Sequence, residues 1–231
     1  MPEPPATIES VFSAIERAGL APRGAFRLTE AEGAGRLAGV RTIALIGTVG
    51  RRGWEAFAAS PEARDGAADP LDRFSRRVVG ELADAFGAVA LFPFGGPPYW
   101  PFQQWAQRAE PVRPSPLGLL IHPVAGLWHS WRGALGLREA LEVPAVAPQP
   151  APCEACRDTP CLAACPVGAF ANAGYDVQGC AAHLRSPAGA ECLERGCLAR
   201  RACPIGAAFA HRSDQASFAM RAFLRARDAA A

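Results

Sequence analysis

All eight cysteines of this chain, the residues best suited to bind a metal or carry redox chemistry, lie between Cys153 and Cys203. They form two groups of four with short spacings. The first group is Cys153, Cys156, Cys161 and Cys165, and the second is Cys180, Cys192, Cys197 and Cys203. Thiolates are soft ligands that suit zinc and iron–sulfur clusters, so this segment is the first candidate for chemistry.

Each group of cysteines closes with one copy of an internal repeat. The segment ACPVGAFA (164–171) recurs as ACPIGAAFA (202–210), so a Cys-Pro pair ends each group. A duplicated cysteine unit in which each half ends in Cys-Pro is the pattern of dicluster ferredoxins. The repeat therefore predicts two 4Fe-4S clusters.

In that pattern the last cysteine of each group ligates the cluster of the other group, which predicts a crossed ligand set. One cluster is then held by Cys153, Cys156, Cys161 and Cys203, and the other by Cys165, Cys180, Cys192 and Cys197. Gaps of four and five residues stand at some positions, where gaps of about two or three are usual. The spacing therefore leaves open which cysteines bind which cluster. It does not change the set of eight predicted ligands.

Two other chemistries use closely spaced cysteines. Two zinc sites could also use the eight cysteines, because the Cys-x2-Cys spacing occurs both in zinc sites and in iron–sulfur sites. Disulfides would need an oxidising compartment, and no basic start followed by an apolar stretch marks an export signal at the N-terminus. The repeat favours clusters over both alternatives, and the missing signal predicts a cytoplasmic protein.

Composition narrows the class of protein. The chain has 231 residues, a formal net charge of +2 and 50% hydrophobic residues, which is typical of a globular protein with a packed core. No apolar run approaches the roughly 18 residues that a membrane span needs, so we expect no membrane association. The near-neutral charge disfavours nucleic acid as a partner.

A proline-rich segment divides the chain. Residues 143–152 (VPAVAPQPAP) hold four prolines, which favours an extended linker. Residues 1–142 are predicted to form an α+β domain, and residues 153–231 a small cysteine domain that ends in a helix over 215–227. Within the first domain, apolar periodicity and capping residues predict helices after Thr7 and from Asp69 to Gly87, and strands over 40–46, 88–92, 117–121 and 127–135.

The first domain has candidates for binding a flat ligand. Aromatic residues gather in residues 93–135 beside the loop GGPP (95–98), and aromatic walls suit a conjugated cofactor. They are equally compatible with an ordinary aromatic core, and each histidine taken alone is more often structural than functional. The candidate cofactor-binding residues are Trp100, His122, Trp128, His129 and Trp131.

The segment LIHPVAGLWHSWRGAL (120–135) resembles the segment that epoxyqueuosine reductases share with the cobalamin-processing CblC (MMACHC) proteins. The reductases also carry a dicluster ferredoxin domain directly after this segment, as here. The resemblance covers about residues 70–210 and implies a nitroreductase/CblC-like α+β domain followed by a dicluster ferredoxin-like domain. It also implies a corrinoid as the ligand of the first domain, with FMN as the alternative.

The resemblance is incomplete. The reductases use an aspartate as proton donor shortly before the shared segment, whereas residues 93–104 contain no carboxylate and the next acid is Glu110. After the cysteines we expect no helical repeats of the kind that would hold a tRNA. We therefore expect an iron–sulfur redox protein that relays electrons from a donor protein to a corrinoid. The alternatives are a simple dicluster ferredoxin and a tRNA-modifying enzyme like epoxyqueuosine reductase.

Overall fold

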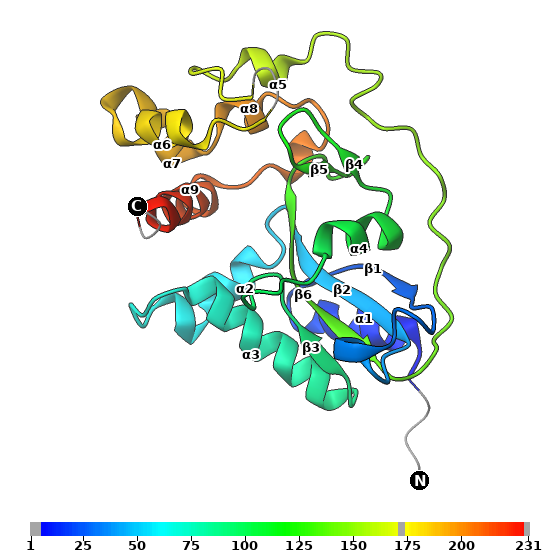
Figure 1. The fold of residues 1–231 in the computed structure, drawn as a ribbon. Coiled ribbons are helices and arrows are strands. Elements are labelled where there is room, and N and C mark those ends of the chain that lie inside the picture. The colour runs from blue at the N-terminus through cyan, green and yellow to red at the C-terminus, as the bar shows by residue number, and fades with distance from the viewer. Residues whose placement is uncertain (1–5, 171–173, 229–231) are drawn as a thin grey trace. The chain divides into compact units, whose positions relative to one another are not determined.

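A computed structural model describes residues 6–170 and 174–228, so that Ala171, the last residue of the first repeat copy, lies outside the described chain. Contacts divide the chain into two units, whose helices and strands are labelled in Figure 1. The N-terminal unit comprises Met1–Pro111 and His129–Pro148. The cysteine unit comprises Val112–Trp128 and Gln149–Ala231.

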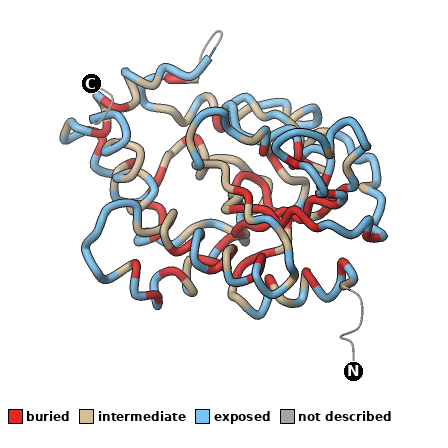
Figure 2. Tube along the Cα trace, turned by 60° about the horizontal axis from the view of Figure 1, so that its bottom comes forward, coloured by how far each residue is buried: buried red, intermediate tan, exposed pale blue. Residues whose placement is uncertain are grey.

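An antiparallel four-stranded sheet forms the centre of the N-terminal unit. The strand order is β1-β2-β6-β3, and Figure 2 shows buried residues concentrated along these central strands. Their bounds are β1 Ala21–Arg27, β2 Thr42–Val49, β3 Val89–Leu91 and β6 His129–Leu137. Apolar side chains fill β2, as expected for a strand that is covered on both faces.

Helices cover the sheet of the N-terminal unit. Helix α3 packs against β3 and β6, whereas α1 and α4 pack against β1 and β2. The helices are α1 Ile8–Arg17, α2 Trp54–Ala59, α3 Pro70–Ala85 and α4 Phe102–Ala109, with 3-10 turns at Gly35–Leu37 and Pro61–Ala63. The chain is therefore mixed α+β with a small antiparallel sheet, which agrees with the predicted fold class.

Helices of four to 16 residues and a small hairpin make up the described part of the cysteine unit. The hairpin pairs β4 Arg113–Pro114 with β5 Leu120–Ile121. The helices are α5 Pro160–Ala163, α6 Val177–Arg185, α7 Ala190–Arg195, α8 Leu198–Arg201 and α9 Ser213–Asp228, with 3-10 turns at Pro187–Gly189 and Ala207–Phe209. Helix α5 packs on α8, and α7 packs on α9.

Several predicted elements are present with shifted ends. The Thr7 hydroxyl accepts a hydrogen bond from the Ser10 amide at the start of α1, as predicted. Asp69 precedes α3, but its backbone is left-handed and its side chain makes no capping hydrogen bond, so its predicted role as a cap is wrong. The strand predicted over 117–121 shortens to Leu120–Ile121 because a turn occupies the residues before it.

The compact units differ from the predicted domains in two respects. The predicted linker 143–152 is divided between the units after Pro148. Residues 112–128 pack with the cysteines rather than with the rest of residues 1–142. The proline-rich residues 143–152 have no helix or strand, as expected for extended backbone. Among the described residues, no helix has both the length and the apolar content that crossing a membrane requires.

Candidate metal centres

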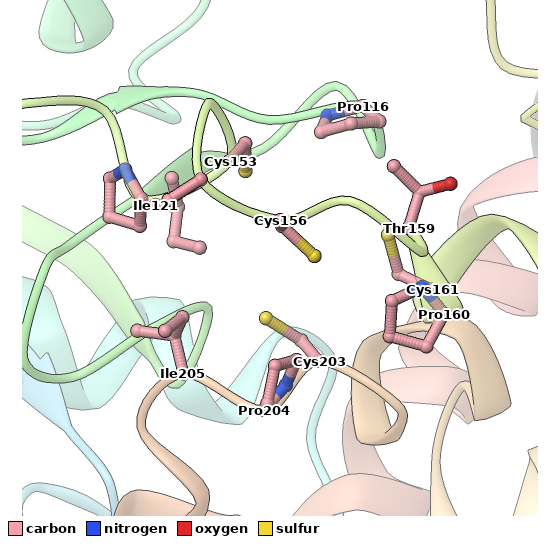
Figure 3. Close-up of a pocket in the computed structure, with 12 residues that line it drawn as sticks. Pro116, Ile121, Cys153, Cys156, Thr159, Pro160, Cys161, Cys203, Pro204 and Ile205 are labelled. Atoms are coloured by element: carbon pink, nitrogen blue, oxygen red, sulfur yellow. The ribbon is translucent and has the colours of Figure 1, made fainter.

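Four cysteine sulfurs face one cavity in the cysteine unit (Figure 3). The cavity has a volume of about 200 Å³, more than ten times the roughly 10–15 Å³ that a single water needs. The cysteines that line it are Cys153, Cys156, Cys161 and Cys203. The structure therefore brings together one of the two sets of four that the crossed pattern predicts.

Turns and helix ends position these four side chains. Cys153 and Cys156 share a turn in which the Cys156 amide donates to the Cys153 carbonyl at 3.2 Å. Cys161 lies in the first turn of α5, directly after Pro160, where proline suits the start of a helix. Cys203 follows α8, and its amide donates to the Arg200 carbonyl at 3.3 Å. The Cys203-Pro204 pair thus places the fourth sulfur, which is distant in sequence, beside the sulfurs of the other three cysteines.

The hairpin residues supply the apolar wall of this cavity. Ile121 lines the cavity and belongs to a buried cluster with Leu117, Leu127 and Cys161. Cys153 and Cys203 pack against the same cluster. An apolar wall excludes water from the sulfur ligands of a metal site. This packing explains why residues 112–128 group with the cysteines.

Two glycines let the hairpin approach the loop after Cys203. Gly126 has a φ of +59°, and a Cβ there would lie 1.9 Å from the Ile205 carbonyl oxygen. Gly206 has a φ of +76°, and its Cβ would lie 2.3 Å from the Ala125 carbonyl carbon. Any side chain at either position would push the two backbones apart.

We expect Gly126→Ala to loosen the wall of this cavity and to destabilise the cysteine unit. Gly87→Ala is the matched control, because Gly87 has a similar φ of +56° but open space around it. The control should lose about 1–2 kcal/mol from the left-handed backbone alone, whereas Gly126→Ala adds a backbone collision. Urea unfolding measures both. Equal losses in the two variants would show that the close approach has no energetic importance.

The other four cysteines line a second, smaller cavity. Its volume is about 20 Å³, and Phe170, Leu184 and Met220 help to enclose it. The cysteines are Cys165 after α5, Cys180 on α6, Cys192 on α7 and Cys197 at the start of α8. The second predicted set is thus also together, although its cavity is closed more tightly than the first.

The electrostatic neighbours of the cysteines divide in the same way. Burial raises the pKa of the Cys153 thiol, and Cys203, Cys161 and Cys156 raise it further. Burial likewise raises the pKa of the Cys180 thiol, with added effects from Cys165 and Cys192. Buried sulfurs that crowd together resist deprotonation unless a cation is present. A thiolate-binding metal centre would supply that positive charge.

The donor set fits iron–sulfur clusters in chemistry and number. All eight cysteines lie in the described chain and none forms a disulfide. Among residues 6–170 and 174–228, no group of three His, Cys, Asp or Glu could hold a single metal ion. A four-iron cluster does not require such convergence, because each thiolate binds a different iron atom.

The five predicted cofactor-binding residues belong to different units. Trp100, His129 and Trp131 lie in the N-terminal unit, whereas His122 and Trp128 lie in the cysteine unit. The His122 Nδ1 atom accepts hydrogen bonds from the backbone amides of Val124 and Ala125, at 3.1 and 3.2 Å. Trp128 is buried, with the Arg200 guanidinium 4.7 Å from its ring centre. Both residues thus make contacts within the cysteine unit, and a cofactor role for them stays a prediction.

Of the five predicted cofactor-binding residues, Trp100 lines a cavity in the N-terminal unit. Its ring stacks on Trp105 with centres 5.6 Å apart, and the Arg36 guanidinium lies 3.9 Å from its centre. The cavity beside these rings has a volume of about 400 Å³ and is also lined by Gln104 and Arg108. That volume is within the range of ligand sites, roughly 300–1,000 Å³. A cofactor role for Trp100 stays a prediction.

A buried ion pair in the N-terminal unit is a feature that the sequence patterns did not predict. The Arg23 guanidinium lies 2.6 Å from the Glu110 carboxylate, and the two side chains are 2% and 9% exposed. The Trp131 Nε1 group donates to the same carboxylate at 2.8 Å. The pKa of Glu110 is raised overall, because the effect of burial outweighs the lowering by Arg23 and Trp131. Trp131 thus belongs to this polar cluster, and the His129 ring lies beside Trp131 with ring centres 5.1 Å apart.

Comparison with solved structures identifies a related fold. The chain resembles a selenomethionine-labelled epoxyqueuosine reductase with a TM-score of 0.56 and 14% identity, over 90% of this chain and 68% of that one. It also resembles an epoxyqueuosine reductase in complex with an epoxyqueuosine-modified tRNA-Tyr stem loop, with a TM-score of 0.50, 14% identity and coverage of 90% and 69%. No protein-family model and no curated protein sequence matches the chain.

At 14% identity this likeness shows a shared fold. The predicted resemblance to epoxyqueuosine reductase is thus confirmed at the level of the fold. The likeness to CblC proteins and to dicluster ferredoxins stays a prediction. The prediction that nucleic acid is disfavoured as a partner stays a prediction.

Proposed function

We propose that this protein is an iron–sulfur oxidoreductase with the fold of epoxyqueuosine reductase, and that it binds two 4Fe-4S clusters. The observation that carries the proposal is the presence of two cavities, each lined by four cysteines. Four thiolates are the ligand set of a 4Fe-4S cluster. The first cluster would be held by Cys153, Cys156, Cys161 and Cys203, and the second by Cys165, Cys180, Cys192 and Cys197.

The protein's own residues would supply insulation and charge to these clusters. When bound, a 4Fe-4S cluster accepts and donates one electron at a time. Ile121 and Ile205 keep water from the first site. Arg200 brings a positive charge toward Cys197, although burial lowers the pKa of its guanidinium to about 10. Positive charge near a cluster stabilises its reduced form.

A modified nucleoside in tRNA is one proposed acceptor of the electrons. It is favoured by the fold shared with a structure that contains a tRNA stem loop. Exposed arginines on α9 of the cysteine unit offer positive charge that suits phosphate. They are Arg221, Arg225 and Arg227. This candidate now has more support than a corrinoid.

A corrinoid is the second proposed acceptor, suggested by the resemblance of residues 120–135 to the segment shared with CblC proteins. The structure gives this segment two environments, because Leu120–Ile121 lies in the cysteine unit and His129–Leu137 in the N-terminal unit. The five residues proposed to contact the cofactor are Trp100, His122, Trp128, His129 and Trp131. Of these, Trp100 lines the ligand-sized cavity described above.

Oxidation of the reduced protein distinguishes the acceptors. Anaerobic protein reconstituted with iron and sulfide is reduced, freed of excess reductant and mixed with hydroxocobalamin or with a tRNA-Tyr stem loop carrying epoxyqueuosine. Return of the cluster absorbance together with a reduced corrinoid spectrum supports the corrinoid, and formation of the reduced nucleoside supports the tRNA. Reoxidation by neither compound, with both clusters present, would overturn the two substrate proposals and leave a carrier of electrons.

A further inference from the structure

His183 lines the second cavity together with Cys165, Cys180, Cys192 and Cys197. It lies on α6, three residues after Cys180. Residues three apart on a helix project from the same face, so the imidazole and the Cys180 side chain reach the cavity from one side. The cavity has a volume of only about 20 Å³. Every group on its wall is therefore close to whatever the four cysteines hold.

The Nε2 atom of His183 is buried and lacks a hydrogen-bond partner. Within residues 6–170 and 174–228, no donor or acceptor is placed to pair with it. An imidazole nitrogen is a strongly polar group, and burying it unpaired costs free energy. An unpaired atom beside a cavity indicates that a group held in the cavity completes the hydrogen bond.

The backbone at the end of α6 holds His183 in place. The Ser186 amide donates to the His183 carbonyl at 2.9 Å, and the Ser186 hydroxyl donates to the same oxygen at 2.8 Å. Gly189 packs so closely on this carbonyl that a Cβ there would lie 2.0 Å from the oxygen. The next residue, Leu184, is buried and also lines the cavity. The point from which the imidazole extends is thus fixed relative to the cavity wall.

The chemistry of a cluster fits this unpaired nitrogen. A 4Fe-4S cluster carries inorganic sulfides in addition to its cysteine ligands, and these sulfurs accept hydrogen bonds. Imidazole supplies an N–H group at Nε2 in one of its neutral tautomers and in its charged form. In the described chain the cysteine sulfurs do not pair with His183 Nε2. A sulfide of the cluster is therefore the acceptor that fits.

We propose that His183 donates a hydrogen bond from Nε2 to a sulfide of the second cluster and so makes its reduction potential more positive. This role rests on the proposed function. A donor to sulfur stabilises the more negative, reduced cluster more than the oxidised one. The proton stays on the nitrogen in both oxidation states, so no bond to hydrogen breaks when the cluster gains or loses its electron.

Two substitutions of His183 separate the hydrogen bond from the packing of the side chain. His183→Leu removes the donor, whereas His183→Gln keeps an N–H group on a side chain of similar length. We expect the potential of the second cluster to become more negative in His183→Leu and to stay near the wild-type value in His183→Gln. The potential of the first cluster should not change in either variant. Redox titration followed by EPR measures both potentials.

Two further variants complete this experiment. Cys161→Ala/Cys203→Ala keeps the four cysteines of the second cavity and identifies the signal of the second cluster. His211→Leu is the matched control. Within the described chain, the His211 Nε2 atom is also buried without a partner, but this residue lines neither cysteine cavity. It should leave both potentials unchanged.

Nitrogen-15 labelling detects the hydrogen bond without reference to a potential. In protein labelled with 15N-histidine, pulsed EPR of the reduced second cluster should show a magnetic coupling to a histidine nitrogen. The coupling should disappear in His183→Gln, whose amide is unlabelled, and persist in His211→Leu. If His183→Leu fails to assemble the second cluster, this measurement decides alone.

The outcomes separate the two proposals. If wild-type protein takes up no iron and sulfide, the proposed function fails. If both clusters assemble but wild-type protein shows no histidine coupling, the role of His183 is wrong while the clusters stand. The same conclusion follows if His183→Leu moves the second potential no further than His211→Leu does.

Discussion

Replacing Cys161 and Cys203 together is expected to remove one cluster and leave the other, so that the iron content falls from about eight to about four per chain. The reason is that both sulfurs face the first cavity, although the two residues come from different groups of cysteines in the sequence. By contrast, replacing Cys161 and Cys165 should remove both clusters, because these neighbours in sequence line different cavities. Iron and sulfide analysis of anaerobically reconstituted protein measures this difference.

The two double variants distinguish the crossed ligand set from a sequential one. If each cluster took its four ligands from one sequence group, Cys161→Ala/Cys165→Ala would keep about four irons and Cys161→Ala/Cys203→Ala would lose nearly all. Ala155→Ser is the matched control, since Ala155 lines the first cavity without a sulfur, and it should keep both clusters. The reverse result in the two double variants would overturn the crossed partition.

Removing the Glu110 carboxylate is expected to destabilise the N-terminal unit by about 3–5 kcal/mol, because Glu110→Ala leaves the charge of Arg23 buried without its partner. Replacing both residues by apolar ones, as in Arg23→Met/Glu110→Leu, should cost much less than Glu110→Ala. Urea unfolding of the full chain, followed by tryptophan fluorescence, measures these changes.

An exposed ion pair provides the control for this prediction. Glu142 lies 3.8 Å from Arg27, and the two side chains are 99% and 52% exposed. Water screens such pairs, so Glu142→Ala should change the free energy of unfolding by no more than about 0.5 kcal/mol. A loss in Glu110→Ala as small as that of Glu142→Ala would show that the buried pair does not support the fold.

Local patterns predicted the elements that depend on local interactions. Helices α1 and α3 follow from apolar spacing, since each buries one stripe of side chains. Strand β1 escaped prediction because its sequence APRGAFR contains a proline, a glycine and two arginines. The first of these arginines, Arg23, is buried because Glu110, far away in the sequence, neutralises it. Pairing of this kind leaves no periodic signal.

The candidate site was predicted only in part, because some of its contacts also join residues that are far apart in the sequence. The repeat with its Cys-Pro ends predicted the two sets of four cysteines that the structure brings together, because a duplicated unit implies its geometry. The packing of residues 112–128 on the cysteines could not be predicted, since it depends on the close approach of Gly126 and Gly206.

Native mass spectrometry of anaerobically prepared protein tests the central claim most directly. The account predicts a mass above that of the chain by two Fe4S4 units. All eight cysteines should be protected from alkylation until the clusters are released. EPR of the reduced protein should then show two interacting spins. A chain that carries zinc, only one cluster, or no metal with cysteines joined in disulfides would contradict the account.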